Sequence, residues 1–344
     1  MDNTKSRGAR SAIPRVFANR RDVLTAALTL GLAGTLSAQE SASAAQPGAQ
    51  DASALDAKLL PGFRVEKVKT SGASLHAVVG GKGPPVLLIH GAPLTHLSWF
   101  RVAPELARQY TVVAADLRGY GDSSKPEDGV DHVNYSKRAM AQDQVELMKH
   151  FGFDRFAVVG HDRGGRVAHR LALDHPSAVT RMAVLDIVPT HYLYTHVTRE
   201  FVDAYFHWFL YIRPAPFPEN ILNADVPGNF GRGALPELRE EYLRVYRNPA
   251  AVHGMCEDYR ASAGIDMKYD EADLGKRIAC PLHVLWASDG AMGRMYDVLG
   301  IWKERGSNVT GAALTGGHNL QEANPAGVLA QLQPFLAPTL GPSA

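Results

Sequence analysis

The sequence predicts an α/β protein in which helices flank a mostly parallel, twisted sheet and a helical cap is inserted. Short, nearly continuous apolar runs alternate with segments of helical periodicity, which is typical of parallel strands buried on both faces. The alternation stops over residues 189–265, where the aromatic-rich stretch FVDAYFHWFLYIRPAPFPEN occurs. We expect this insertion to cover the carboxyl edge of the sheet, where open α/β sheets place their sites.

Length and composition agree with one globular unit. The chain has 344 residues, of which 45% are hydrophobic and 21% are charged, and its formal net charge is +1. These values fit one α/β domain with an insertion. Basic residues form no run in the part expected to fold, so nothing indicates a nucleic-acid partner. We expect a small-molecule partner, and no phosphate-loop, dinucleotide or metal motif indicates a cofactor.

The first 45 residues have the features of a twin-arginine export signal. Arg20 and Arg21 precede an apolar run (23–36) and an A-x-A cleavage pattern (42–44). The apolar run is shorter than the roughly 20 residues that cross a membrane, so an anchor fits less well. We expect a periplasmic or secreted protein, no stable membrane association after removal of the signal, and a linker over residues 46–60.

The elements of the folded part are expected in the following order. The alternating segments FRVEKVKT and SLHAVVGG form a hairpin. Five parallel strands then follow: PPVLLIH (84–90), YTVVAAD (110–116), RFAVVGH (155–161), RMAVLDI (181–187) and PLHVLWA (281–287). Helices are expected over 99–109, 135–151 and 163–174. The core therefore spans residues 61–188 and 266–338, and the cap spans 189–265.

The segment Gly160-His161-Asp162-Arg163-Gly164 has the spacing of a nucleophile elbow, G-x-S-x-G, with aspartate in place of serine. Such a turn exposes its central residue at the carboxyl edge of the sheet, so we interpret Asp162 as a nucleophile rather than as a helix cap. A carboxylate that attacks an alkyl carbon forms an ester, which an activated water can hydrolyse. The motif therefore indicates an alkyl halide or an epoxide as substrate.

The water needs a base, and the chain order nucleophile, acid, histidine indicates His318 in the segment ALTGGHNLQEANP. The acid that orients the imidazole has two candidates, Asp186 in AVLDIVPT and Asp289 in LWASDGAMG. Asp186 is favoured because its strand is expected to neighbour the strand that carries the elbow.

Other groups are expected to surround the nucleophile. The backbone N–H groups of Ala92, in the loop HGAP, and of Arg163 are candidates for the oxyanion hole. Arg163 flanks Asp162, and Arg166 lies one helical turn further on the same face, so both guanidiniums can point over the site. Arginine binds carboxylate oxygens in pairs. Two arginines beside a nucleophile therefore indicate an anionic substrate.

Several segments resemble motifs of the haloacetate and fluoroacetate dehalogenases of the α/β-hydrolase superfamily: VVGHDRGGR, VLDIVPT, HWF, PFPENI, CEDYRA and GGHNL. The resemblance implies the α/β-hydrolase fold, a homodimer, and site roles for Asp162, His318, Asp186, Arg163, Arg166, His207 and Trp208. The first three would be nucleophile, base and orienting acid, and the arginines would bind the substrate carboxylate. His207 and Trp208 would donate hydrogen bonds to the leaving halide.

One departure from the family concerns the halide pocket. The resemblance implies a tyrosine shortly after CEDYRA in fluoroacetate-active relatives, whereas this chain has Gly264 at that position. We therefore expect a missing hydroxyl donor, and chloride and bromide as better leaving groups than fluoride.

The sequence thus predicts a hydrolase, free of metal and cofactor, that converts a short 2-haloacid to the hydroxy acid and halide through an aspartyl ester. Its substrate would be a small anionic organohalogen. Two alternatives remain. An epoxide hydrolase would use cap tyrosines, for which Tyr205 and Tyr211 are available. A non-catalytic periplasmic protein would bind carboxylates without turnover.

Overall fold

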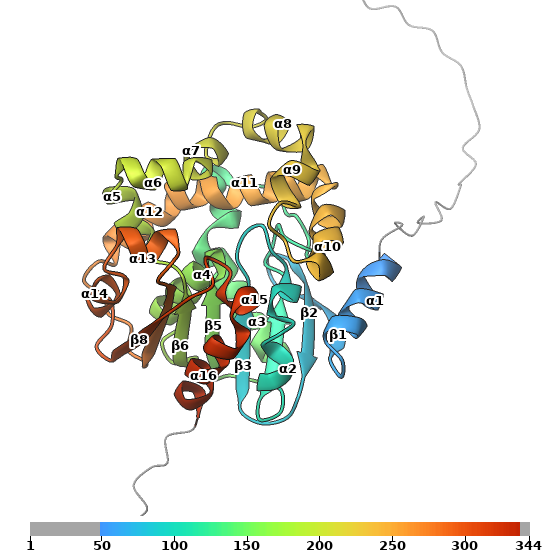
Figure 1. The fold of residues 1–344 in the computed structure, drawn as a ribbon, viewed down its shortest axis with the longest axis vertical. Coiled ribbons are helices and arrows are strands. Elements are labelled where there is room, and N and C mark those ends of the chain that lie inside the picture. Colours follow the sequence, from blue (N-terminus) through green and yellow to red (C-terminus); the bar gives the residue numbers. More distant parts are fainter. Residues whose placement is uncertain (1–48, 338–344) are drawn as a thin grey trace, which may run out of the picture. The chain divides into compact units, whose positions relative to one another are not determined.

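The computed structural model describes residues 49–337, and its centre is one eight-stranded sheet (Figure 1). The strands lie in the order β1-β2-β4-β3-β5-β6-β7-β8. Their bounds are β1 (Arg64–Lys69), β2 (Ser74–Gly80), β3 (Pro85–Ile89), β4 (Thr111–Ala115), β5 (Phe156–His161), β6 (Val179–Leu185), β7 (Leu282–Ala287) and β8 (Val309–Leu314). The predicted α/β class, the hairpin and the five parallel strands are confirmed.

Strand direction brings several loops to one edge of the sheet. The strands from β3 to β8 are parallel, whereas β1 and β2 pair antiparallel with each other and β2 pairs antiparallel with β4. Gly160 of β5 is in register with Ile89 of β3 on one side and with Val184 of β6 on the other. The loops that leave β3, β5 and β6 therefore emerge side by side at the carboxyl edge.

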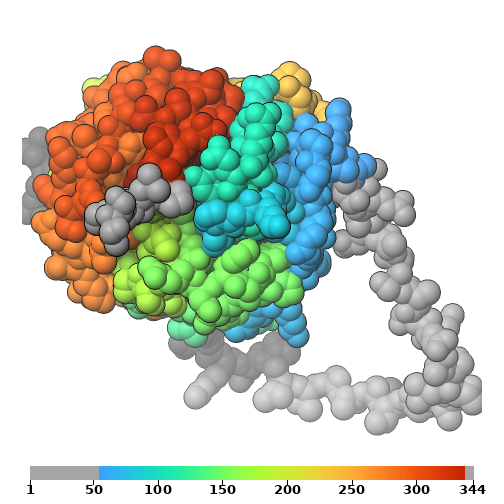
Figure 2. Space-filling model, turned by 90° about the horizontal axis from the view of Figure 1, so that it is seen from below, coloured from blue at the N-terminus to red at the C-terminus, as the bar shows by residue number. Residues whose placement is uncertain are grey.

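Helices cover both faces of the sheet. Alternate residues of β3 point into two separate hydrophobic clusters, as expected for a strand buried on both faces. The helices α3 (Lys137–His150) and α4 (Arg163–Asp174) pack together over the first cluster. On the second cluster, α16 (Pro325–Leu336) packs against α2 (Ala103–Leu106), and Figure 2 shows the red carboxyl-terminal part beside the teal segment.

The predicted helices over 135–151 and 163–174 are confirmed by α3 and α4. The predicted helix over 99–109 is confirmed only in part: α2 lies within this range but is four residues long, and the preceding η1 (His96–Trp99) ends where the helix was expected to begin. Pro104 stands in the first turn of α2. Proline lacks the N–H that a helix continuing from Trp99 would need, so it begins a helix instead. The remaining core helices are η2 (Val130–Tyr135), α13 (Ala291–Met295), α14 (Val298–Lys303) and α15 (Leu320–Ala323).

The segment expected to be a linker, residues 46–60, contains the helix α1 (Ala49–Leu59). The alanine-rich composition that suggested a linker also has high helix propensity. Leu60 packs into the second hydrophobic cluster, and the carboxylate of Asp56 contacts two buried histidines of the core. Tertiary contacts thus hold α1 on the core, which is why the linker interpretation is wrong for these residues.

Helices fill the region where the cap is expected. They are α5 (Thr190–Thr195), α6 (Arg199–Ala204), α7 (Phe206–Tyr211), α8 (Phe217–Ala224), α9 (Val226–Phe230), α10 (Pro236–Tyr246) and α11 (Pro249–Ala263). The next helix, α12 (Ile265–Ala272), begins at the last residue of the expected cap and extends into the segment that was assigned to the core. In Figure 1 they gather above the sheet, with α11 running across its upper edge. The insertion therefore lies over the loops that leave the parallel strands.

The predicted export signal (1–45) lies outside the described residues. Within residues 49–337, no helix combines the length and the apolar character that crossing a membrane requires.

Candidate active site

Asp162 occupies the tight turn between β5 and α4. Its φ is +46°, a left-handed conformation that non-glycine residues rarely adopt. A Cβ atom at Gly160 would lie 2.4 Å from the carbonyl oxygen of Gly164, and one at Gly164 would lie 2.4 Å from that of His90. The turn therefore requires glycine on both sides of the strained aspartate, as the elbow motif predicts.

The loops after β6 and β8 bring an acid and a histidine to this turn. His318 Nδ1 lies 2.7 Å from Asp186 Oδ2, and His318 Nε2 lies 3.7 Å from Asp162 Oδ2. Asp186 is buried, and its other oxygen accepts a hydrogen bond from the Ala287 N–H (2.8 Å). The imidazole is thus fixed on its Nδ1 side and faces the nucleophile position with Nε2.

The second candidate acid, Asp289, does not contact the imidazole. Its carboxylate accepts hydrogen bonds from the N–H groups of Gly316 and Gly317 at 3.1 Å. These glycines immediately precede His318, whose carbonyl oxygen lies 2.9 Å from His161 Nε2. Asp289 therefore braces the loop that carries the histidine, while Asp186 contacts the ring itself.

The two carboxylates decide the charge of the histidine. Burial would lower the pKa of His318, but the proximity and charges of Asp162 and Asp186 outweigh it and raise the pKa to about 10. Burial raises the pKa of Asp162, but His318, and after it His161 and Arg166, hold this pKa well below its usual value. With no substrate bound, Asp162 is therefore an anion and His318 a cation at neutral pH.

The oxyanion candidates differ in this structure. The Ala92 N–H donates to Asp162 Oδ1 (3.0 Å). The Arg163 N–H makes no such bond with the Asp162 carboxylate among residues 49–337. A Cβ at Gly91 would lie 2.5 Å from Asp162 Cβ, so the loop before Ala92 passes directly against Asp162.

Arg163 is fully buried, and one edge of its guanidinium is already occupied. Nε and Nη2 donate to the Asp258 carboxylate at 3.0 and 2.6 Å, and Nη2 also donates to Ser262 Oγ (2.5 Å). The guanidinium carbon lies 4.1 Å from the centre of the Tyr259 ring. Only Nη1 has no hydrogen-bond partner within the described part of the chain. The sequence suggested that the Arg163 guanidinium could bind a substrate carboxylate with a pair of donors. This needs correction, because Nε and Nη2 already donate to Asp258.

Arg166 has no acidic partner of this kind. Its Nη1 donates to the Val188 carbonyl (2.9 Å) and to Thr190 Oγ1 (3.1 Å), and no carboxylate of residues 49–337 binds it. Its guanidinium carbon lies 4.7 Å from the centre of the Trp208 ring, and its Nε is buried without a partner in the same residues. Burial and then the charge of Arg163 lower the pKa of Arg166 to about 10. The site therefore holds a cation that an anion would stabilise.

Aromatic side chains of the cap form a wall beside the two arginines. The Tyr259 ring centre lies 6.0 Å from that of His207 and 5.7 Å from that of Trp208. Tyr211 is the next ring, 5.1 Å from Tyr259. Burial lowers the pKa of His207 to about 4, so this imidazole is neutral at pH 7 and donates one N–H. Burial and then Asp162 raise the pKa of Tyr259, which keeps its hydroxyl protonated.

Gly264 does not lie in this wall. It ends α11, and the nearest atom to a Cβ built there is the Arg260 carbonyl oxygen (3.2 Å). The tyrosine beside His207 and Trp208 is Tyr259, inside the segment CEDYRA. The interpretation of Gly264 as the position of a missing hydroxyl donor is therefore wrong, because the tyrosine in this wall is Tyr259, which precedes Gly264 in the chain.

Two residues that hold the site were missed by the sequence analysis. Asp258 is buried and binds Lys137 as well as Arg163, and Tyr120 donates to it (2.6 Å). Thr190 positions Arg166. The segment CEDYRA was quoted for its resemblance, but nothing in its spacing indicated which distant arginine Asp258 would bind.

Comparisons with known proteins agree with this geometry. The family model of the alpha/beta hydrolase fold matches residues 84–325. A fluoroacetate dehalogenase of Burkholderia sp. is 46% identical over 291 residues, which cover 81% of this chain and 95% of the relative. A soluble epoxide hydrolase of Corynebacterium sp. strain C12 is 30% identical over 78% of this chain and 95% of its own. A mutant hydrolase of Pseudomonas aeruginosa, provisionally described as an epoxide hydrolase and solved with bound MFA, is 46% identical with a TM-score of 0.75, covering 80% of this chain and 96% of that one.

Proposed function

Because the chain belongs to the haloacetate and fluoroacetate dehalogenase family of the alpha/beta hydrolase fold, we propose that it hydrolyses the carbon–halogen bond of a short 2-haloacid to the hydroxy acid and halide. One observation carries the proposal: Asp162 at the elbow lies in the same buried site as Arg166, whose guanidinium makes no hydrogen bond with a carboxylate of residues 49–337. A nucleophilic carboxylate suits an alkyl carbon, and a guanidinium without a bonded carboxylate suits an anion. A small anionic organohalogen meets both requirements.

In the first step, a carboxylate oxygen of Asp162 attacks the carbon that bears the halogen. The new C–O bond forms as the carbon–halogen bond breaks, and the bonding electron pair leaves with the halide. The strained turn and the Ala92 N–H hold the carboxylate in place for this displacement. The product is a neutral ester of Asp162.

In the second step, His318 becomes the base. Ester formation removes the negative charge of Asp162, which is one of the two charges that raise the pKa of His318. The pKa therefore falls, His318 releases its proton to solvent, and Nε2 then takes a proton from the attacking water. The resulting hydroxide adds to the ester carbonyl carbon, and the oxyanion faces the Ala92 N–H. On collapse the bond to the alkoxide oxygen breaks, and this oxygen takes the proton from His318, which releases the hydroxy acid. The Asp162 carboxyl then passes its proton to His318, which restores the starting charges. Asp186 keeps the ring oriented throughout.

The substrate carboxylate would bind between the two arginines. Each of these two guanidiniums has a buried nitrogen without a partner within residues 49–337, namely Arg163 Nη1 and Arg166 Nε. Each would give one charge-assisted hydrogen bond, which orients the haloacid and holds its reacting carbon near Asp162. An epoxide is neutral and gives Arg166 nothing to bind, which is the reason to rank epoxide hydrolysis second despite the epoxide hydrolase relatives.

The halide would leave toward His207, Trp208 and Tyr259. Chloride and bromide break away more easily than fluoride, so we still expect higher rates with them. Tyr259, whose ring packs beside His207 and Trp208, would add a hydroxyl donor, so fluoroacetate also falls within the proposed substrate range. Replacing Tyr259 by phenylalanine should slow fluoride release about a hundredfold and chloride release less, because the poorer leaving group depends more on preorganised donors.

Halide release by the purified chain tests the proposal. Chloroacetate, bromoacetate and fluoroacetate should each yield stoichiometric halide and glycolate, and Asp162→Asn should yield none. Opening of styrene oxide without halide release would favour the epoxide hydrolase. Binding of chloroacetate without turnover would favour the carboxylate-binding protein. Export and a homodimer stay predictions, which amino-terminal sequencing of the periplasmic protein and its mass in solution would test.

A further inference from the structure

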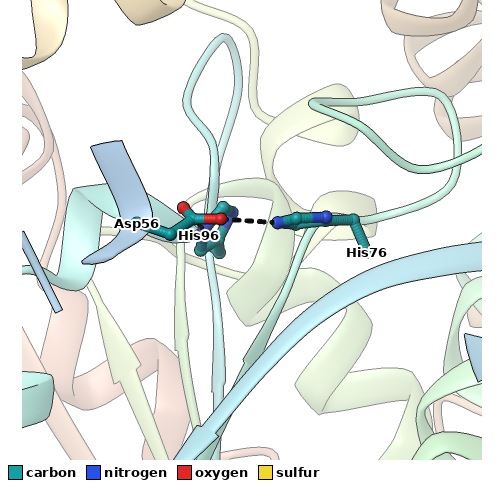
Figure 3. Close-up of side chains that lie close together, drawn as sticks. All are labelled: Asp56, His76 and His96. Carbon is teal, nitrogen blue, oxygen red and sulfur yellow. Dashed lines mark hydrogen bonds and ion pairs between the residues drawn. The ribbon is translucent and has the colours of Figure 1, made fainter. Parts of the chain in front are cut away.

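A second group of histidine and aspartate side chains lies away from the nucleophile, and three elements contribute to it. Asp56 comes from α1, His76 from β2 and His96 from η1 (Figure 3). Asp56 Oδ1 lies 2.8 Å from His96 Nε2, and Asp56 Oδ2 lies 3.2 Å from His76 Nε2. The three ligand atoms all lie within 4.8 Å of one another. One carboxylate thus faces two imidazole nitrogens.

Burial makes this arrangement costly unless its charges are matched. The residues are only 3%, 8% and 2% exposed for Asp56, His76 and His96. Among residues 49–337, Asp56 is bonded by these two histidines and by no lysine or arginine. Positive charge at this carboxylate must therefore come from an imidazole or from a bound cation.

A comparable cluster in the cap is neutralised differently. Asp128, His253 and Glu257 also bring ligand atoms within 4.8 Å of one another. There, Arg260 Nη1 donates to both Glu257 and Glu219 at 2.7 Å. A guanidinium already supplies the cation in the cap, so the two clusters differ in the one feature that matters for binding a metal ion.

A further carboxylate supports His96 from behind. Asp116 Oδ1 lies 2.9 Å from His96 Nδ1 and accepts the His96 backbone N–H (2.8 Å). Its other oxygen accepts the Asp122 N–H (2.8 Å), which fixes the carboxylate. Metal-binding histidines usually donate their second ring N–H to such a carboxylate, which sets the tautomer and turns the other nitrogen to the metal. His96 is oriented in this way, with Nε2 turned to Asp56.

We propose that Asp56, His76 and His96 bind one divalent transition-metal cation of the zinc class, and that Asp116 positions His96 for it. Two nitrogens and one carboxylate oxygen suit this class of ion, and water would complete four-coordination. Two carboxylates, two neutral imidazoles and a dication carry no net charge. On binding, the contacts of Asp56 with the imidazoles become bonds to the metal. The Nε2 proton of His96 is released to solvent, and the Nε2 proton of His76 moves to its Nδ1, so that both Nε2 atoms offer a lone pair.

The site would stabilise the fold rather than take part in the proposed hydrolysis. It joins α1 to the core at η1, which begins four residues after Ala92 along the chain. A bound ion would therefore pin the first described helix and the segment that continues from the oxyanion loop.

Metal titration of the full chain tests the proposal. After treatment with a chelator, calorimetry with zinc chloride should give one equivalent bound with a Kd of about 1 µM or lower, and a raised Tm. Asp56→Asn and His76→Gln should each weaken binding about a hundredfold, and Asp116→Asn about tenfold. His253→Gln, in the cap cluster with its arginine, is the matched control and should bind as the parent does.

Cobalt provides a readout that does not depend on a variant that folds. The parent chain and His253→Gln should develop the visible absorption of four-coordinate cobalt at one equivalent, and zinc should displace it. No zinc or cobalt binding below about 100 µM, or equal binding by the parent, Asp56→Asn and His76→Gln, would overturn the proposal. The cluster would then only join α1 to the core through hydrogen bonds.

Discussion

Two histidines in this molecule each lie between two aspartates, and the difference between their surroundings decides what each can do. His318 lies 2.7 Å from Asp186 but 3.7 Å from Asp162, and its side chain is 35% exposed. His96 lies 2.9 Å from Asp116 and 2.8 Å from Asp56, and its side chain is 2% exposed. The first arrangement is open on one side, whereas the second is closed on both.

The charges of the two histidines are alike. Burial lowers the pKa of each imidazole, but the neighbouring carboxylates outweigh it and raise the pKa to about 10 in both cases. A raised pKa therefore does not distinguish a reactive site from a structural one. What distinguishes them is the long contact: His318 Nε2 lies 3.7 Å from Asp162, beyond the usual hydrogen-bond distance, so in the proposed mechanism it can take a proton from water.

The largest effect is expected at the open histidine. His318→Ala should lower kcat about 10⁴-fold or more, because the ester forms but no base activates water. Mass spectrometry after mixing with bromoacetate should find a carboxymethyl group on Asp162. If this variant is folded and binds the haloacid but Asp162 stays unmodified, the proposed covalent step is wrong.

The next effect concerns the cation on the open side. Arg166→Ala should lower kcat/KM for chloroacetate about a hundredfold, and lysine at this position should restore only part, because it keeps the charge but loses the planar guanidinium. Arg138→Ala is the control, since Arg138 makes a half-exposed ion pair with Asp174. Equal kcat/KM for the parent and Arg166→Ala would show that Arg166 does not bind the substrate carboxylate.

In the network of Asp56 and His96, a substitution should lower the stability of the fold and leave turnover unchanged. Asp56→Asn, measured with chelator present, should lower the free energy of unfolding by about 2 kcal/mol, because two buried hydrogen bonds lose their charged acceptor. Its kcat should stay within twofold of the parent. Urea denaturation and halide release measured on the same preparation check this. A loss of turnover without loss of stability would contradict the division between the two networks.

The smallest effect is a change with pH that separates the two proposed steps. Formation of the ester should be flat from pH 5.5 to 8.5, since the pKa of Asp162 is held well below this range. Hydrolysis should rise about tenfold per pH unit below pH 6.5 and then level off, because the pKa of His318 returns toward its ordinary value of about 6.5 once Asp162 is esterified. Rapid-quench measurement of halide, which reports ester formation, and of glycolate, which reports hydrolysis, checks the pH dependence of both steps. Hydrolysis that still rises through pH 10 would show that the pKa stays raised in the ester.

Much of the candidate site could be predicted because it depends on local sequence and strand order. The glycines around Asp162 dictate a turn that only they permit. The apolar runs identify parallel strands, and parallel strands bring the loops that follow them to one edge. Asp162 and Asp186 each follow such a strand, and the chain order nucleophile, acid, histidine indicates His318, so their proximity could be inferred without coordinates. The strand before His318, β8, was not among the five predicted parallel runs, because it is not continuously buried. Their roles in catalysis stay predictions.

Other features depend on contacts between segments far apart in the chain. Asp258 reaches Arg163 across 95 positions and Asp56 reaches His96 across 40, and neither separation follows a helical or strand period. Burial turned the expected linker into α1, and the packing of α11 against α7 put Tyr259 rather than Gly264 beside His207.

The sequence by itself therefore determined the fold class, the turn at Asp162 and the order of the groups around it, because local sterics and strand polarity leave few choices. Only the tertiary structure decided that Asp186 rather than Asp289 contacts His318, that Arg166 rather than Arg163 lacks an acidic partner, and which histidine network is open. These outcomes depend on which buried charges meet, and a buried charge takes the partner that packing brings within reach.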